Sequence, residues 1–166
     1  ISRWTDINVK RPDKDDLVVS GSDVPVMTSL FNDVKGEVLG LSHESKIYRL
    51  SCADGRITCE LKGSVSSLLE KEEVNSVCID REGRLWLNTT LGRILRSDET
   101  MHKFENVSLD NEIDDCTVLG LLSDKNSVWI ITNKKVLQYN IDSQTFQHYS
   151  TADDNIMVDV FRYKAI

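Results

Sequence analysis

The side chains of this sequence best suited to metal binding or catalysis are four cysteines and three histidines: Cys52, Cys59, Cys78, Cys116, His43, His102 and His148. No two cysteines form a C-x-x-C pair, and no two histidines stand at ligand spacing, so the pattern argues against a zinc site. A G-x-S-x-G nucleophile turn and a phosphate-binding glycine loop are also missing from the sequence. We therefore predict no catalytic residue, no metal site and no cofactor.

One acidic run has the composition of a cation-binding loop. It is Asp110-Asn111-Glu112-Ile113-Asp114-Asp115. It lacks the D-x-[DN]-x-[DN]-G pattern and the closing glutamate that calcium loops use. We interpret it as a solvated connector. We likewise expect the three histidines to lie in turns or outer strands, exposed to solvent.

The cysteines have two different expected roles. Cys78 lies in the apolar run Val77-Cys78-Ile79 and is predicted to be a small buried hydrophobic residue. Cys52 and Cys59 flank the turn Asp54-Gly55, where a two-residue hairpin would pair Cys52 with Ile57 and leave Cys59 diagonal. Because a disulfide requires a narrow geometry, free thiols are the favoured interpretation, with a Cys52–Cys59 disulfide as the alternative.

Length and composition indicate an ordinary globular domain. The chain has 166 residues, of which 40% are hydrophobic and 28% charged, and a formal net charge of -7. This charge repels phosphate and anionic lipid, so we expect neither a nucleic-acid partner nor membrane contact. No apolar run approaches the roughly 20 residues of a membrane-spanning helix. The first residue is Ile1 and no signal segment follows, so we expect a processed or excised part of a longer protein.

The most informative pattern is an internal repeat. Trp86 and Trp129 are 43 residues apart, and each lies between two similar apolar runs. A third copy upstream places Leu39 at the tryptophan position. The spacing from Leu39 to Ile47 is eight residues, which equals the spacing from Trp86 to Ile94.

The copies are predicted to consist of short strands. Their apolar runs are four to seven residues long, rich in β-branched and aromatic residues, and bounded by turns such as Asp80–Gly83 and Asp124–Ser127, where a small or flexible residue can take positive φ. Four short antiparallel strands per 40–50 residues are typical of a propeller blade. The sequence thus predicts an all-β protein of β-propeller blades. Residues 66–73 could form a helical turn or a loop between blades.

We expect about three recognisable blades and two partial ones. The blades are 26–63, 74–109 and 118–150, with outer strands or the end of a preceding blade in 1–25 and the start of a following blade in 151–166. One blade cannot cover its own apolar faces, so stacking should bury them, with Trp86 and Trp129 in the interfaces rather than in a ligand site. An open arc would leave two faces uncovered, which predicts contact with other blades or with a second copy in a homodimer.

The segment from Asp80 to Gly92 reads D-x-x-G-x-L-W-x-x-T-x-x-G, which resembles the two-component-regulator propeller repeat. The copy that contains Trp129, with Tyr139 and then Phe146 and Tyr149, resembles the end of the same repeat. Two departures stand out: Asn88 and Ile131 replace the glycine of the usual W-I-G-T sequence. The resemblance implies the periplasmic sensor region of hybrid two-component histidine kinases of Bacteroidetes, which respond to carbohydrate-derived ligands.

The resemblance therefore implies a non-catalytic sensing module with a small carbohydrate ligand. The alternatives are an intracellular protein-interaction propeller and a propeller enzyme such as a glycosidase, although the Trp-Asp and double-glycine signatures of common scaffold propellers are missing. Ligands of such folds usually bind in loops. Those loops lie near Asn75 and Thr117 and in the turns 90–92 and 133–135. The sequence does not rank them, so the ligand-binding residues stay unknown.

Overall fold

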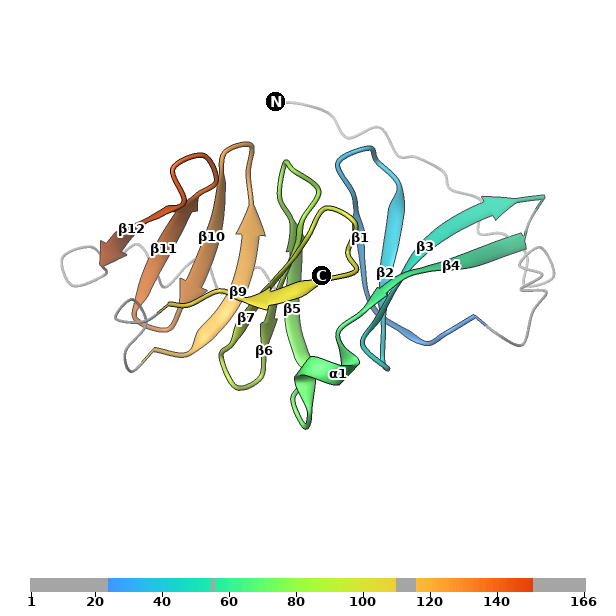
Figure 1. Ribbon diagram of the computed structural model, residues 1–166, viewed down its shortest axis with the longest axis horizontal. Coiled ribbons are helices and arrows are strands. Elements are labelled where there is room, and N and C mark those ends of the chain that lie inside the picture. Colours follow the sequence, from blue (N-terminus) through green and yellow to red (C-terminus); the bar gives the residue numbers. More distant parts are fainter. Residues whose placement is uncertain (1–23, 55, 110–115, 151–166) are drawn as a thin grey trace, which may run out of the picture.

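The computed structural model describes residues 24–54, 56–109 and 116–150. These residues form three four-stranded antiparallel sheets and one short helix (Figure 1). The prediction of an all-β propeller architecture is confirmed. The partial blades expected within 1–23 and 151–166, and the acidic run 110–115, lie outside the described residues.

Each sheet is a meander of four consecutive strands, which we call blades 1, 2 and 3. Blade 1 contains β1 (Met27–Asn32), β2 (Val38–Ser42), β3 (Lys46–Ala53) and β4 (Arg56–Ser64); blade 2 contains β5 (Val74–Ile79), β6 (Leu85–Thr89), β7 (Ile94–Ser97) and β8 (Phe104–Asn106); blade 3 contains β9 (Val118–Ser123), β10 (Ser127–Thr132), β11 (Lys135–Asn140) and β12 (Thr145–Ser150). The first strands are the inner ones, since β5 lies against both β1 and β9. Helix α1 (Ser66–Leu69) connects blades 1 and 2.

The turns between the first two strands of blades 1 and 2 need glycine. Gly36 and Gly83 adopt φ of 80° and 79°, a region that side-chain-bearing residues rarely enter. The corresponding turn of blade 3 is one residue shorter. Asp124 N–H donates to the carbonyl oxygen of Ser127, three residues ahead, whereas Asp80 N–H in blade 2 donates to that of Arg84, four residues ahead. No residue from 124 to 127 has positive φ. The sequence-based expectation of positive φ in this turn was therefore wrong.

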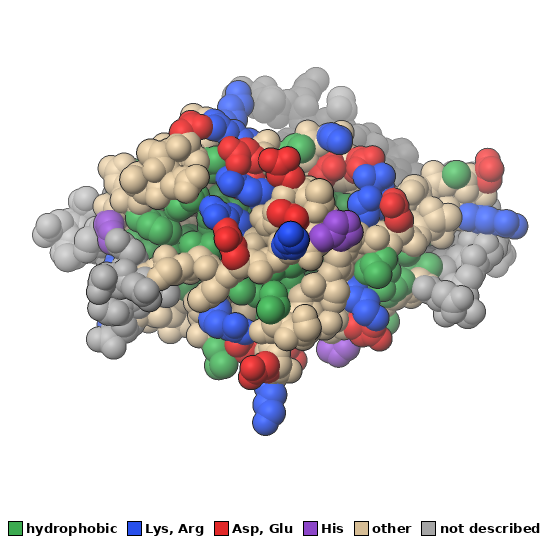
Figure 2. Space-filling model, viewed as in Figure 1, with side chains coloured by type: hydrophobic (Ala, Val, Ile, Leu, Met, Phe, Trp, Pro, Cys, Tyr) green, Lys and Arg blue, Asp and Glu red, His purple; other side chains and the backbone are tan. Residues whose placement is uncertain are grey.

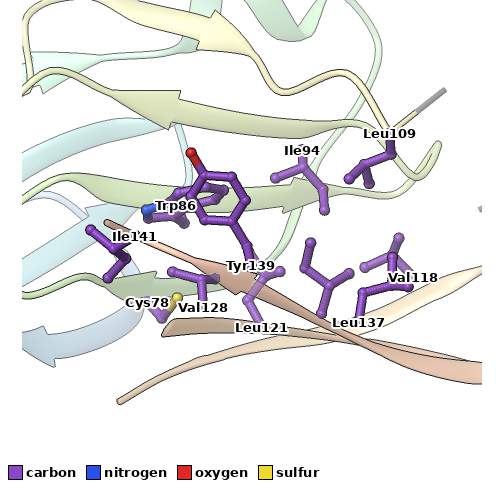
Figure 3. Close-up of a cluster of buried hydrophobic side chains, with 11 residues drawn as sticks. Cys78, Trp86, Ile94, Leu109, Val118, Leu121, Val128, Leu137, Tyr139 and Ile141 are labelled. Atoms are coloured by element: carbon purple, nitrogen blue, oxygen red, sulfur yellow. The ribbon is translucent and has the colours of Figure 1, made fainter. Parts of the chain in front are cut away.

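Two apolar cores lie between the blades. Blades 1 and 2 share a cluster that includes Leu39, Leu41, Ile47, Leu85, Leu87 and Leu95. Blades 2 and 3 share the cluster drawn in Figure 3, which includes Trp86, Ile94, Val128, Ile130, Leu137 and Tyr139. Alternate residues of β6 thus face opposite neighbours, as the two-residue period of a strand requires. Burial on both faces of blade 2 is what holds the three sheets together.

The residues matched by the repeat occupy equivalent positions. In the antiparallel ladder between the second and third strands, Leu39 lies opposite Arg49 and Trp86 lies opposite Arg96. The two partners are ten residues apart in the sequence in both blades. Leu39 faces blade 2 and Trp86 faces blade 3. Trp129 lies on the corresponding side of blade 3, where no described blade covers it, and is only partly buried. Interface packing is therefore confirmed for Trp86. Trp129 instead stacks on Tyr149 of its own blade, with ring centroids 5.7 Å apart.

The departure at Asn88 provides an inter-blade polar contact. Asn88 is fully buried, and its Nδ2 donates to the Val118 carbonyl oxygen of blade 3 at 3.4 Å. Ser76 Oγ donates to Asn88 Oδ1 and accepts the Leu121 N–H at 3.0 Å. The side chain that replaces glycine is thus satisfied where β5 and β9 meet, as a buried amide must be.

The cysteine predictions agree with the structure. All four cysteines are free, and Cys52 pairs with Ile57 across the β3–β4 hairpin as expected. Cys78 is buried in the core between blades 2 and 3, and desolvation raises the pKa of its thiol to about 12. Within the described ranges, no helix is long and apolar enough to span a bilayer.

Candidate functional site

The loops named in the sequence analysis lie on one rim of the blades. The turn after the second strand of each blade bonds to the start of the inner strand: His43 N to Val26 O at 2.9 Å, Thr90 N to Glu73 O at 2.9 Å, and Asn133 N to Thr117 O at 3.1 Å. We call this the lower rim, since these turns lie at the bottom of Figure 1. The structure therefore brings both groups of predicted loops together. The upper rim carries the opposite turns.

The lower rim holds a cavity of about 230 Å³ at the junction of blades 1 and 2. Its polar lining residues are Thr28, Ser42, His43, Ser45, Glu72 and Glu73. Blade 1 supplies the first four, from β1, β2 and the β2–β3 turn. The two glutamates come from the linker between α1 and β5. The expected positions Asn75, 90–92 and 133–135 do not line this cavity.

Glu72 is the most unusual group in the cavity. Its side chain is only 9% exposed, and its Oε1 lies 2.6 Å from Arg93 Nη2. Its other oxygen, Oε2, is buried and has no hydrogen-bond partner among the described residues. Hydrogen bonding from Arg93 first, and from the Thr89 hydroxyl to a smaller extent, holds the pKa of this carboxyl below its usual value, so the group is a carboxylate at neutral pH. Sequence reasoning missed Glu72, because one acidic residue in a polar linker carries no periodic signal.

The upper rim holds a larger cavity, of about 490 Å³, between the same blades. Four of its charged side chains, Glu37, Arg49, Glu60 and Lys62, form ion pairs with one another, although Arg49 Nε is buried without a hydrogen-bond partner among the described residues. Arg49 Nη2 lies 3.0 Å from Glu37 Oε2 and its Nη1 lies 3.6 Å from Glu60 Oε2, while Lys62 Nζ lies 3.1 Å from Glu60 Oε1. A charged ligand would have to displace these pairs. This cavity is therefore the weaker candidate despite its size.

A shallow hollow on the upper rim brings the repeat aspartates Asp33, Asp80 and Asp124 together. Their carboxylates already accept backbone hydrogen bonds in their own turns. Asp33 Oδ1 accepts the N–H groups of Lys35 and Glu37, each at 2.8 Å. These aspartates stabilise turns and are not free to bind a cation.

The histidines lie where the repeat places them. His43 and His102 are exposed in turns, and His148 is exposed on β12. No three His, Cys, Asp or Glu side chains in the described part of the chain form a group that could hold a metal ion. Figure 2 shows acidic and basic side chains interspersed over the visible face, without a large patch of one sign.

No family model matches the sequence, and no curated protein matches it. In structure, the chain is similar to the extracellular domain of a hybrid two-component system of B. thetaiotaomicron, with 18% identity, a TM-score of 0.51, and coverage of 74% of this chain and 16% of that one. It is similar to YCF48 bound to D1 peptide, with 24% identity, a TM-score of 0.53, and coverage of 74% and 39%. YCF48 from Cyanidioschyzon merolae gives 11% identity, a TM-score of 0.50, and coverage of 78% and 42%.

These likenesses establish the propeller fold and not a shared activity. The chain spans less than half the length of each of the three proteins.

Proposed function

We propose that this chain is part of the extracytoplasmic propeller of a hybrid two-component sensor and takes part in sensing a small carbohydrate-derived ligand. The observation that carries the proposal is the D-x-x-G-x-L-W unit of Asp80–Trp86, which forms the turn and second strand of a four-stranded blade. The fold of the extracellular domain from B. thetaiotaomicron supports it. In this proposal the chain acts in the periplasm and binds without catalysis.

In this function the chain would be the ligand-binding part of a transmembrane signalling protein. Ligand binding would favour one of two arrangements of the propeller assembly, and the shift in population would pass across the membrane to a kinase. The upper-rim residues Arg49, Glu37 and Glu60 are engaged in ion pairs with one another, which fits a binding module better than a set of side chains poised for acid–base catalysis.

The parent protein tests this proposal. We expect its sequence to continue into a membrane helix and a histidine kinase. We also expect that adding neutral oligosaccharides to the membrane-embedded protein changes its autophosphorylation rate. A parent without membrane helix and kinase would contradict the proposal.

A second candidate function is a protein-interaction propeller. It is favoured by the likeness to YCF48, which was solved with a bound D1 peptide. Capture of one stable protein partner by the purified chain, with no sugar raising its melting temperature, would favour this function over sensing.

We further propose that a second copy of the chain covers the exposed outer faces of blades 1 and 3. Leu30 on blade 1 is 64% exposed and Leu122 on blade 3 is 60% exposed. Each belongs to the face that its blade turns away from blade 2. Blade 2 contacts its neighbours through two different faces, so blade 3 of one copy can meet blade 1 of another in the same head-to-tail manner.

A further inference from the structure

Glu72 Oε2 marks a binding position on the lower rim. A buried carboxylate oxygen without a donor is costly, so most such atoms in folded proteins have a partner. This one belongs to a side chain that is 91% buried and that lines a cavity of about 230 Å³. The Thr89 hydroxyl interacts with the same carboxyl, but Oε2 itself makes no hydrogen bond with the described residues. A ligand that donates to Oε2 would complete the hydrogen bonding of the carboxylate.

The carboxylate is held in place before any ligand arrives. Arg93 Nη2 contacts Glu72 Oε1 at 2.6 Å and also donates to the Leu68 carbonyl oxygen at 2.6 Å. The guanidinium thus joins the β6–β7 turn to helix α1 and to the linker behind it. Because its supports are fixed, Glu72 can accept a hydrogen bond with little loss of side-chain entropy.

The facing wall of the cavity offers hydroxyl groups. Ser42 is buried, and its Oγ accepts the backbone N–H of Lys46 at 3.2 Å, which leaves its own hydrogen free to donate. Ser45, with φ of 59°, turns the chain beside it. A ligand between the walls therefore meets a carboxylate acceptor on the linker that precedes β5 and a hydroxyl donor on blade 1.

The charge of the cavity selects the class of ligand. Glu72 and Glu73 repel an anion. Arg93 already offsets the charge of Glu72, so the carboxylate needs a donor more than a further cation. The volume is below the range of about 300–1,000 Å³ that holds drug-sized molecules, which fits a single small ring.

We propose that this inter-blade cavity binds a small neutral polyhydroxylated molecule, such as a monosaccharide, with one ligand hydroxyl donating to Glu72 Oε2 and another accepting from Ser42. The assignment of sugars as the ligand class rests on the proposed sensing function. The position of the site rests on the structure alone.

Ligand-observed NMR and calorimetry on the purified chain test the site, with glucose, galactose and xylose as neutral probes and glucosamine and glucuronate as charged ones. We expect at least one neutral probe to bind, with at least a tenfold loss of affinity in Glu72→Gln. Glu70→Gln is the matched control, because it removes the same charge two residues away at an exposed position. It should bind as the unchanged chain does.

A blocking variant guards against misfolding of Glu72→Gln. His43 is exposed and lines the cavity, so His43→Trp should fill it while leaving the melting temperature unchanged. Loss of binding in both variants supports the site. Binding of neutral probes that both variants retain, binding of glucosamine alone, or no binding of any neutral probe would overturn it.

The outcomes separate this site from the sensing proposal. If the parent kinase responds to a sugar and Glu72→Gln does not alter the response, sensing stands and this site is wrong. If the chain binds a neutral probe through Glu72 but the parent lacks a kinase, the site stands and the sensing proposal fails.

Discussion

Asp80 Oδ2 accepts the indole N–H of Trp86 at 2.8 Å, and both side chains are fully buried. The other oxygen, Oδ1, accepts the backbone N–H groups of Glu82 and Arg84, each at 3.0 Å. One carboxylate therefore closes the turn and also satisfies the only polar atom of the large residue that packs against blade 3. The spacing of six residues between Asp80 and Trp86 in blade 2 has this physical basis.

Removal of the Asp80 carboxylate should destabilise the chain strongly. Asp80→Ala leaves the buried indole N–H and two turn N–H groups without their acceptor and also removes the ion-pair partner of Arg84. We therefore expect a loss of about 2–4 kcal/mol in the free energy of unfolding. Asp124→Ala is the matched control, because Asp124 makes the same bond to Trp129 at an exposed position. We expect it to cost about 1 kcal/mol or less. Equal costs in urea denaturation would contradict the role assigned to Asp80.

Sequence reasoning found the blades because their signals are local. Each strand alternates over a few residues, and each turn needs an aspartate or a glycine, so a single sequence carries both. It missed the shorter turn at Asp124, where the tryptophan follows after five residues instead of six. This one-residue deletion preserves the aspartate–indole bond and cannot be seen in a repeat aligned on the tryptophans alone.

The Asp124 carboxyl should titrate below its ordinary value. The hydrogen bond from the Trp129 indole, at 2.7 Å, lowers its pKa from 3.8, with help from the Asn126 N–H. A carboxyl whose pKa is lower in the folded state stabilises the fold above pH 3.8 and loses that contribution as the pH falls through the folded value. Trp129→Phe should therefore move the pKa of Asp124 upward in an NMR titration. An unchanged pKa would show that the indole does not donate to it.

Thiol reactivity should rank the cysteines by exposure. Cys52 is exposed and free, so Ellman's reagent should label it rapidly in the native chain. Cys78 should react only after unfolding, because burial removes access and raises its pKa to about 12. Cys52→Ser should remove the fast phase. A native chain in which neither Cys52 nor Cys59 reacts would indicate a disulfide between them.

Association should depend on the apolar outer faces. We expect sedimentation of the purified chain to show self-association that increases with concentration. Leu122→Glu on blade 3 and Leu30→Glu on blade 1 should each weaken it, since both residues lie on exposed faces. Leu91→Glu is the control, because Leu91 is 77% exposed but lies in the β6–β7 turn. A strict monomer at high concentration would contradict association through these faces.

The candidate site was harder to predict than the fold. Thr28, Ser42 and Glu72 come from three separate elements, and only the stacking of blades 1 and 2 brings them together. The contact made by Asn88 could not be predicted from the sequence for the same reason. Its polar side chain at a glycine position marks a difference in packing, but its acceptor, the Val118 carbonyl, becomes evident only once β9 lies beside it.

The central claim is that blades 2 and 3 are held together by a shared apolar core, and the contact between Trp86 and Tyr139 tests it most directly. Their ring centroids lie 5.1 Å apart across the interface. Figure 3 draws both side chains within the shared core. A double-mutant cycle with Trp86→Leu and Tyr139→Leu should give a coupling of about 0.5–1.5 kcal/mol in the free energy of unfolding. Strictly additive effects would mean that the two rings do not touch, and would contradict the stacked-blade architecture.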